Sequence, residues 1–347
     1  MQKSNKLEKI ARSVVVIVLI IGILISRDSV LGIGLPTVIL TTQTIPSSPM
    51  LEGHMAEVYD LIGIGDIRFQ IEQEIMQESA RNHVFTEEDL YRLRDFEYLR
   101  TQFFVSDRNT RLLPQDIDID TAIRADLTID TSPTPGPRVL IFHTHSTEMF
   151  ADSDPANPFD GVLGIGAYLA QVLQRDHGIQ TIHDTTRYDI VDGRSQIMGS
   201  YERMEPYIRQ ILQDNPTIEV VIDLHRDGVP ETMPPLVTYI DGKRVARIMF
   251  VNGLSRRYNS DGVLEPVEWL PNPYLRENLA FSFQLQMSAN RLFPGFTRRV
   301  YLKAFRYSLH LMPRTMLLEV GAQTNTIEEA RNAVPFIAEV IADVVLG

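Results

Sequence analysis

The sequence contains no cysteine. This absence excludes disulfide bonds and thiolate metal sites, so histidine, aspartate and glutamate are left as the strong metal ligands. The chain also lacks a surplus of basic residues, because 33 Lys and Arg stand against 45 Asp and Glu and give a net charge of −12. Since phosphate binding needs a basic face, we expect no nucleic-acid partner.

The N-terminus lacks an apolar run of full membrane-spanning length. Residues 13–26 are apolar and follow several basic residues, but the run is short for a span of about 20 residues. A membrane segment from Lys9 to Ile33, with Arg27 at the outer interface, would be long enough. We favour an uncleaved single-pass signal anchor within residues 1–40 at the cell membrane, with a cytoplasmic tip and the residues from about 40 onward extracytoplasmic. A cleaved signal peptide or a buried core segment are the alternatives.

The middle of the chain separates into regions of different composition. Residues 41–54 are polar and contain proline, which suits a linker, and residues 55–105 carry the apolar spacing of helices. Three prolines at 131–137 mark the clearest domain boundary. We therefore predict a helical membrane-proximal region with its linker over 41–134 and a separate domain over 135–347.

Apolar strand-like runs and helical patterns alternate after residue 137. The predicted strands are 138–143, 179–183, 217–224, 247–252 and 316–320, and the predicted helices are 160–175, 197–214, 274–292 and 326–345. Asp241-Gly242 between two apolar runs predicts a tight hairpin. This alternation predicts an α/β fold with an open, twisted, mostly parallel sheet flanked by helices.

Metal-binding residue types stand at the ends of three of these strands. His143, His145 and Glu148 follow the first strand, His225 ends a second, and Glu319 lies in the last. The carboxyl ends of parallel strands meet at one ligand crevice. Two imidazoles and a carboxylate make a zinc site with an open fourth position, and a further glutamate can act as general base.

The two histidines of the first segment are candidates for the same role. Strand alternation points His143 and His145 to the same side. The spacing His145-x-x-Glu148 favours His145 as the zinc ligand, together with Glu148 and His225. His143 is the alternative ligand; otherwise it supports the site or contacts substrate.

Residues around His225 and Glu319 have supporting or structural alternatives. Asp223 shares a strand face with His225 and can orient its ring. Arg226 either pairs with Asp227 or binds a substrate carboxylate. Glu319 is the candidate general base, and a salt bridge to an arginine such as Arg314 is its alternative.

The three segments together resemble stage II sporulation protein P. The resemblance rests on His143-Thr144-His145-Ser146-Thr147-Glu148, on Asp223-Leu224-His225-Arg226-Asp227, and on Glu319-Val320-Gly321 followed by Asn325-Thr326-Ile327-Glu328-Glu329-Ala330. It covers about 135–347 and the anchor arrangement, although Tyr307-Ser308-Leu309-His310 departs from the family pattern. The family resembles zinc-dependent N-acetylmuramoyl-L-alanine amidases, and some members are credited with endopeptidase activity.

The resemblance implies a role for each part of the site. One of His143 and His145 with Glu148 and His225 would hold Zn²⁺, Glu319 would be catalytic, and Asn325 would support the site or bind substrate. The implied partners are peptidoglycan, the membrane, a membrane-anchored lytic transglycosylase and a membrane scaffold protein, in sporulation engulfment. The alternatives are a zinc endo- or carboxypeptidase on stem peptides and an inactive wall-binding scaffold.

Overall fold

The computed structural model describes residues 87–132 and 135–347. The predicted anchor, the linker and the helical pattern up to residue 86 lie outside these residues. Within the described part of the chain, no helix is both long enough and apolar enough to cross a membrane. The anchor and the division of the chain at residue 135 therefore stay predictions.

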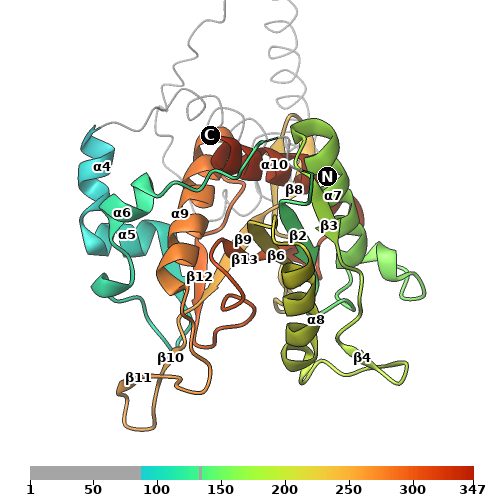
Figure 1. Cartoon of the computed structure of the whole chain (residues 1–347), viewed down its shortest axis with the longest axis horizontal. Coiled ribbons are helices and arrows are strands. Elements are labelled where there is room, and N and C mark those ends of the chain that lie inside the picture. The colour runs from blue at the N-terminus through green and yellow to red at the C-terminus, as the bar shows by residue number, and fades with distance from the viewer. Residues whose placement is uncertain (1–86, 133–134) are drawn as a thin grey trace, which may run out of the picture. The chain divides into compact units, whose positions relative to one another are not determined.

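A seven-stranded sheet forms the centre of the fold (Figure 1). Its strands are ordered β1 (Phe104–Ser106), β12 (Val300–Lys303), β9 (Ile248–Gly253), β13 (Thr315–Ala322), β6 (Val220–Asp227), β2 (Val139–Phe142) and β3 (Thr181–His183). Every neighbouring pair is parallel except β9 with β13, which is antiparallel. The predicted mostly parallel α/β sheet is confirmed, and it consists of two parallel blocks of opposite direction.

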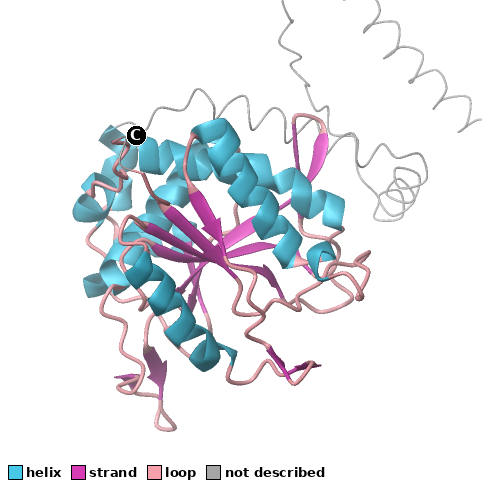
Figure 2. Cartoon of the chain, turned by 45° about the vertical axis from the view of Figure 1, so that its right-hand side comes forward, coloured by secondary structure: helices cyan, strands magenta, loops and turns pink. Residues whose placement is uncertain are grey.

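Helices cover the two faces of this sheet unequally (Figures 1 and 2). The larger core joins one face to α7 (Val162–His177), α9 (Leu275–Leu292) and α10 (Ile327–Leu346). On the other face, α8 (Ser200–Asp214) packs on β2 and β6 through a smaller cluster that includes Met204, Ile208, Leu140 and Val221. A third, small cluster of Met249, Val251 and Leu317, with Tyr301 and Tyr307 against it, lies over β9 and β13.

Residues on both sides of the proline-bearing stretch at 131–137 contribute to the fold. β1 pairs with β12, and α6 (Ile119–Arg124) contacts α9. At the end of the region predicted to be helical, two short helices form, α4 (Glu87–Leu93) and α5 (Phe96–Phe103). The break occurs because the Asp95 side chain accepts from the amides of Glu97 and Tyr98 and so begins a new helix.

Shorter elements surround the sheet. The predicted hairpin is confirmed as β7 (Val237–Ile240) and β8 (Lys243–Ala246), with both turn residues, Asp241 and Gly242, at positive φ. Two further hairpins pair β4 (Ile190–Val191) with β5 (Arg194–Ser195) and β10 (Arg256–Tyr258) with β11 (Leu264–Pro266). Two 3₁₀ turns, η1 (Pro114–Asp116) and η2 (Pro158–Asp160), complete the described elements.

Candidate metal centre

His145, Glu148 and His225 converge beside the end of β2. The Glu148 carboxylate lies between the two rings, with Oε1 at 3.4 Å from His145 Nδ1 and Oε2 at 3.3 Å from His225 Nδ1. One ligand atom from each residue lies within 4.8 Å of the others, so the three side chains could hold a metal ion. Two imidazoles and one carboxylate match the donor set of catalytic zinc sites.

Strand β6 fixes the orientation of His225. Because side chains alternate along a strand, Asp223 and His225 share a face, and His225 Nε2 lies 2.7 Å from Asp223 Oδ1. Nε2 of His225 is thus bonded to Asp223, and Nδ1 faces Glu148. Burial alone would lower the pKa of His225, but the charges of Asp223 and Glu148 outweigh it and raise that pKa well above its ordinary value. Such an orienting carboxylate is typical of metal-binding histidines.

Two buried aspartates hold the loop that carries His145 and Glu148. Asp223 accepts from the amide and hydroxyl of Thr144, at 2.9 and 2.8 Å. Asp189 accepts from Ser146 Oγ at 2.6 Å and from the amide and hydroxyl of Thr147 at 2.9 and 2.6 Å. Asp189 has no sequence signal, because nothing in its neighbourhood distinguishes it from a surface residue. These bonds fix the loop before any ligand binds.

Arg226 supports Glu148 through its backbone. Its amide donates to Glu148 Oε2 at 3.0 Å, and its side chain donates to the carbonyls of Met149 and Asp227 at 3.0 and 3.2 Å. The Asp227 carboxylate pairs with Arg298 at 2.6 Å. The considered ion pair between Arg226 and Asp227 is therefore wrong, because the guanidinium is directed to backbone carbonyls on both sides of the site.

Glu319 lies opposite His225 in the register of β13 and β6. Its side chain is partly buried, and Oε2 has no hydrogen-bond partner among the described residues. Burial raises the pKa of Glu319 to about 8, with His225 opposing the shift and Glu148 adding to it. The alternative salt bridge to Arg314 is wrong, because Arg314 pairs with Glu219 at 3.3 Å. The structure thus places an unpaired carboxyl group beside the three candidate ligands.

His143 lies on the other side of the sheet from His145. Its Nδ1 is 2.7 Å from the Leu224 carbonyl and its Nε2 is 2.8 Å from His183 Nε2, while His145 packs against Tyr201 of α8. A Cβ on Gly166 of α7 would come within 2.5 Å of His143 Nε2, so the glycine makes room for this ring. The expectation that both histidines point to one side is wrong, because β2 ends at Phe142 and the alternation does not continue into the loop.

Asn325 is not part of the cluster. Its side chain accepts from the amide of Ala322 at 2.9 Å and donates to the Leu236 carbonyl at 3.1 Å and to Glu329 at 2.8 Å. Gly321, at φ 63°, leaves space for the Asn325 carboxamide. In this structure Asn325 joins the turn after β13 to the segment before β7.

Two tyrosines that are not among the predicted site residues stand next to the cluster. The Tyr201 ring lies 5.6 Å from the His145 ring and 5.5 Å from the Tyr307 ring. Burial, with contributions from Asp223, Tyr307 and nearby glutamates, raises the pKa of Tyr201 well above its ordinary value. No hydrogen bond of the Tyr201 hydroxyl is found within the described residues, so it is a free donor beside the site. Neither tyrosine has a sequence signal, because both lie outside the strand-end motifs.

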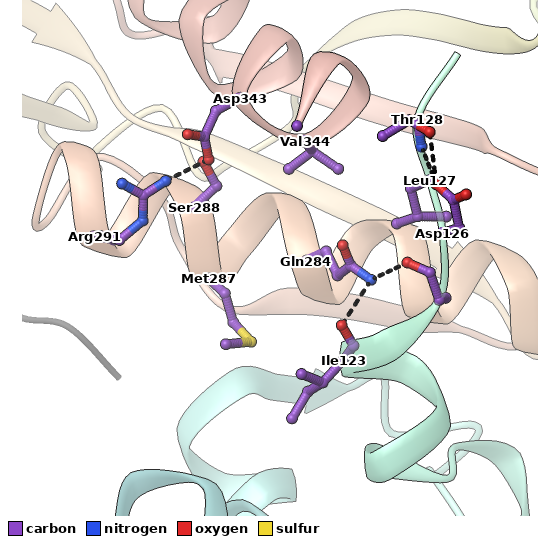
Figure 3. A pocket seen from close by; sticks show the side chains of 12 residues that line it. Ile123, Asp126, Leu127, Thr128, Gln284, Met287, Ser288, Arg291, Asp343 and Val344 are labelled. Carbon is purple, nitrogen blue, oxygen red and sulfur yellow. Dashed lines mark hydrogen bonds and ion pairs between the residues drawn. The ribbon is translucent and has the colours of Figure 1, made fainter. Parts of the chain in front are cut away.

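A separate pocket of about 330 Å³ lies between α9, the end of α10 and residues 123–128 (Figure 3). Ser288 and Arg291 both donate to Asp343, and Gln284 donates to the carbonyls of Ala122 and Ala125. Its polar groups are thus paired with one another, and none of its lining residues belongs to the cluster. We assign it no role in the chemistry of the site.

Comparison with known families agrees with the resemblance found in the motifs. The family description "Stage II sporulation protein P (SpoIIP)" matches residues 70–342. The Stage II sporulation protein P of Bacillus subtilis (strain 168) is 24% identical over 219 residues, covering 59% of this chain and 50% of that protein. The chain thus spans about half the length of this curated relative.

Solved structures with a similar arrangement include two amidases. The N-acetylmuramoyl-L-alanine amidase AmiC2 of Nostoc punctiforme has 16% identity and a TM-score of 0.36, covering 60% of this chain and 95% of that one. An N-acetylmuramoyl-L-alanine amidase from Clostridium difficile 630 has 16% identity and a TM-score of 0.34, covering 61% and 95%.

Proposed function

This chain belongs to the Stage II sporulation protein P family, and we propose that it is a zinc-dependent N-acetylmuramoyl-L-alanine amidase. The observation that carries the proposal is the cluster of His145, Glu148 and His225 with the unpaired Glu319 carboxyl beside it. His145, Glu148 and His225 would hold a zinc ion, which when bound would supply a Lewis acid for the substrate carbonyl and lower the pKa of a water molecule. Glu319 Oε2 is buried without a hydrogen-bond partner among the described residues. Because buried polar atoms are normally hydrogen-bonded, such an atom supports a catalytic or ligand-binding role.

Glu319 is the proposed proton carrier. A carboxyl group with a pKa near neutrality can both accept and return a proton efficiently. It would take a proton from the attacking water as the new C–O bond forms at the lactyl carbonyl. It would then deliver that proton to the alanine nitrogen as the C–N bond breaks, which releases muramic acid carboxylate and a stem peptide with a free amine.

Tyr201 is the proposed donor to the carbonyl oxygen. Its ring contacts His145, and its hydroxyl has no partner among the described residues. A preorganised donor that meets charge developing in the transition state accelerates acyl transfer. The ring also packs against Tyr307, which supports its position.

The bonds of Arg226 weigh against a zinc carboxypeptidase. Such an enzyme needs a cation for the terminal carboxylate of its substrate, and Arg226 is the arginine within the motifs. Its side chain instead holds the carbonyls of Met149 and Asp227. An endopeptidase that cuts crosslinks between stem peptides needs no such cation and is the second candidate.

The cellular setting is also a proposal. We place the catalytic domain outside the cytoplasmic membrane, with the segment at residues 1–40 as its anchor and peptidoglycan as its partner. A membrane-anchored lytic transglycosylase and a membrane scaffold protein are the proposed protein partners, during sporulation engulfment.

Digestion of purified peptidoglycan by the full chain, with products identified by mass, tests the proposed activity. An amidase releases stem peptides with free alanine amines and leaves glycan strands without peptides. Cut crosslinks with peptides still on the glycan would instead identify an endopeptidase. Unchanged peptidoglycan under zinc-replete conditions would point to a wall-binding scaffold. The Glu319→Gln chain is the matched control.

A further inference from the structure

A pocket of about 230 Å³ lies next to the candidate metal centre and has no role in the proposal above. It opens between the first turn of α8 and the loop that follows β12. Tyr201, Phe305, Tyr307 and Leu270 supply its apolar walls. Phe305 is 40% exposed, so part of an aromatic ring faces solvent inside a hollow. A concave site with apolar walls and a few polar groups is the usual form of a ligand site.

The pocket is joined to the metal centre by its aromatic wall. Tyr201 belongs to both, because its ring contacts His145 on one side and Tyr307 on the other, with centroids 5.6 and 5.5 Å apart. Tyr307 has φ 52°, a conformation that bulky residues rarely adopt. The fold imposes this conformation, and such backbone positions are concentrated at functional sites.

The Glu205 carboxylate of the pocket is held by three neighbouring side chains. Glu205 Oε2 lies 3.1 Å from Arg306 Nη2 and 3.0 Å from His310 Nε2, and its Oε1 lies 2.8 Å from Arg209 Nη2. Glu202 adds a second carboxylate to the lining. Arg306 is thus paired, so the pocket offers no free cation for a carboxylate, while Glu202 has no ion pair among the described residues. The group that fits it carries no carboxylate and can donate hydrogen bonds to Glu202.

We infer that this pocket binds one N-acetylhexosamine ring of the glycan strand, an inference that rests on the proposed function. A pyranose ring has an apolar C–H face that can lie on the negative face of an aromatic ring. Its hydroxyl and acetamido groups can bond to the remaining donors and acceptors of Arg306 and Glu205. Stem peptides carry carboxylate groups, for which the pocket has no free cation. Its volume is below the roughly 300–1,000 Å³ of pockets that enclose a whole small ligand, so it suits one unit of a polymer.

Calorimetric titration of the full chain with tri-N-acetylchitotriose, three linked N-acetylglucosamine units, tests the inference. We expect Phe305→Ala to weaken binding at least tenfold and Phe305→Tyr, which keeps the ring, to retain it. Tyr91→Ala is the matched control, because Tyr91 is 73% exposed on α4 and does not line the pocket. A thermal melt of each variant verifies that the chain is folded.

Three results would overturn the inference: no binding of the trisaccharide by the wild-type chain, equal binding by Phe305→Ala, or Phe305-dependent binding of a free stem peptide instead. The proposed activity fails separately. If the wild-type chain binds trisaccharide but releases no peptide from peptidoglycan, the amidase proposal falls and the sugar site stands. If it releases peptide but does not bind the sugar, only the sugar site falls.

Discussion

The two faces of the central sheet have opposite compositions within the same strands. In β6, Val220, Ile222 and Leu224 are fully buried in the core shared with the helices on one face. Asp223 and His225 alternate with them and point to the face of α8. In β13, Met316 and Leu318 belong to the same large core, while Glu319 points to the other side.

This difference shows how one strand can provide stability and chemistry together. The apolar face packs under three helices, and the burial of aliphatic side chains stabilises the fold. Burial of polar groups on the other face costs little stability, because neighbouring segments supply their hydrogen-bond partners, such as Thr144 for Asp223. The rigid apolar face therefore holds the polar face in position for binding.

The largest expected effect is the difference in zinc binding between variants of the two histidines after β2. His145→Ala removes one of three candidate ligands, so we expect loss of bound zinc and of all activity. His143→Ala should retain zinc, because its ring lies against Gly166 and His183 on the side covered by α7. Metal content of both variants, measured side by side by mass spectrometry, decides between them. Zinc retained in the first and lost from the second would reverse the assignment.

Adjacent residues of β6 provide a second test. Ile222→Ala leaves a cavity in the large core and should lower the free energy of unfolding by about 2–5 kcal/mol without changing zinc affinity. Asp223→Asn should weaken zinc binding about 10- to 100-fold, because the carboxylate that orients His225 is lost. Chemical denaturation and zinc titration of both variants measure the two effects. Equal losses of zinc affinity would show that the faces are not separable.

A third test concerns the unpaired carboxyl group. Glu319→Gln is nearly isosteric and should keep the fold and the zinc, but an amide cannot accept the proton. We expect turnover to fall about 100-fold or more, as for loss of a general base. Rates of peptide release from peptidoglycan, compared with zinc content, measure it. Wild-type turnover in this variant would give Glu319 a structural role.

Sequence patterns predicted the elements that carry strong periodicity or continuous apolar runs. The helices now seen as α7, α8, α9 and α10 and the central strands β2, β6, β9 and β13 were all expected within a few residues. β1 and β12 were not expected, because each is only three or four residues long and each depends on a partner far along the chain. Their formation is decided by pairing, which a local pattern does not contain.

The candidate site was predictable where residues share a motif and not where they meet only in space. His145 and Glu148 lie three positions apart, and Asp223 and His225 alternate on one strand, so sequence spacing placed each pair. Tyr201 lies in a helix whose apolar spacing predicts only a face buried in the core, and not a site residue. The opposite orientation of His143 depends on where β2 ends, which strand alternation alone cannot give.

The smallest expected effect concerns Asp189, which holds the ligand loop from the α8 side. Burial would raise the pKa of Asp189, but bonds from Ser146 and Thr147 outweigh it and hold that pKa below its ordinary value. A depressed folded-state pKa contributes stability above the unfolded pKa of about 3.9, and this contribution is lost as the pH falls through the folded value.

Asp189→Asn should therefore lower the free energy of unfolding by about 1 kcal/mol at pH 7. Because asparagine does not titrate, the difference from wild type should shrink as the pH falls below about 4. Denaturant titrations of both chains at pH 7, 5 and 3 test this, and a difference that is constant with pH would show that the carboxylate charge contributes nothing.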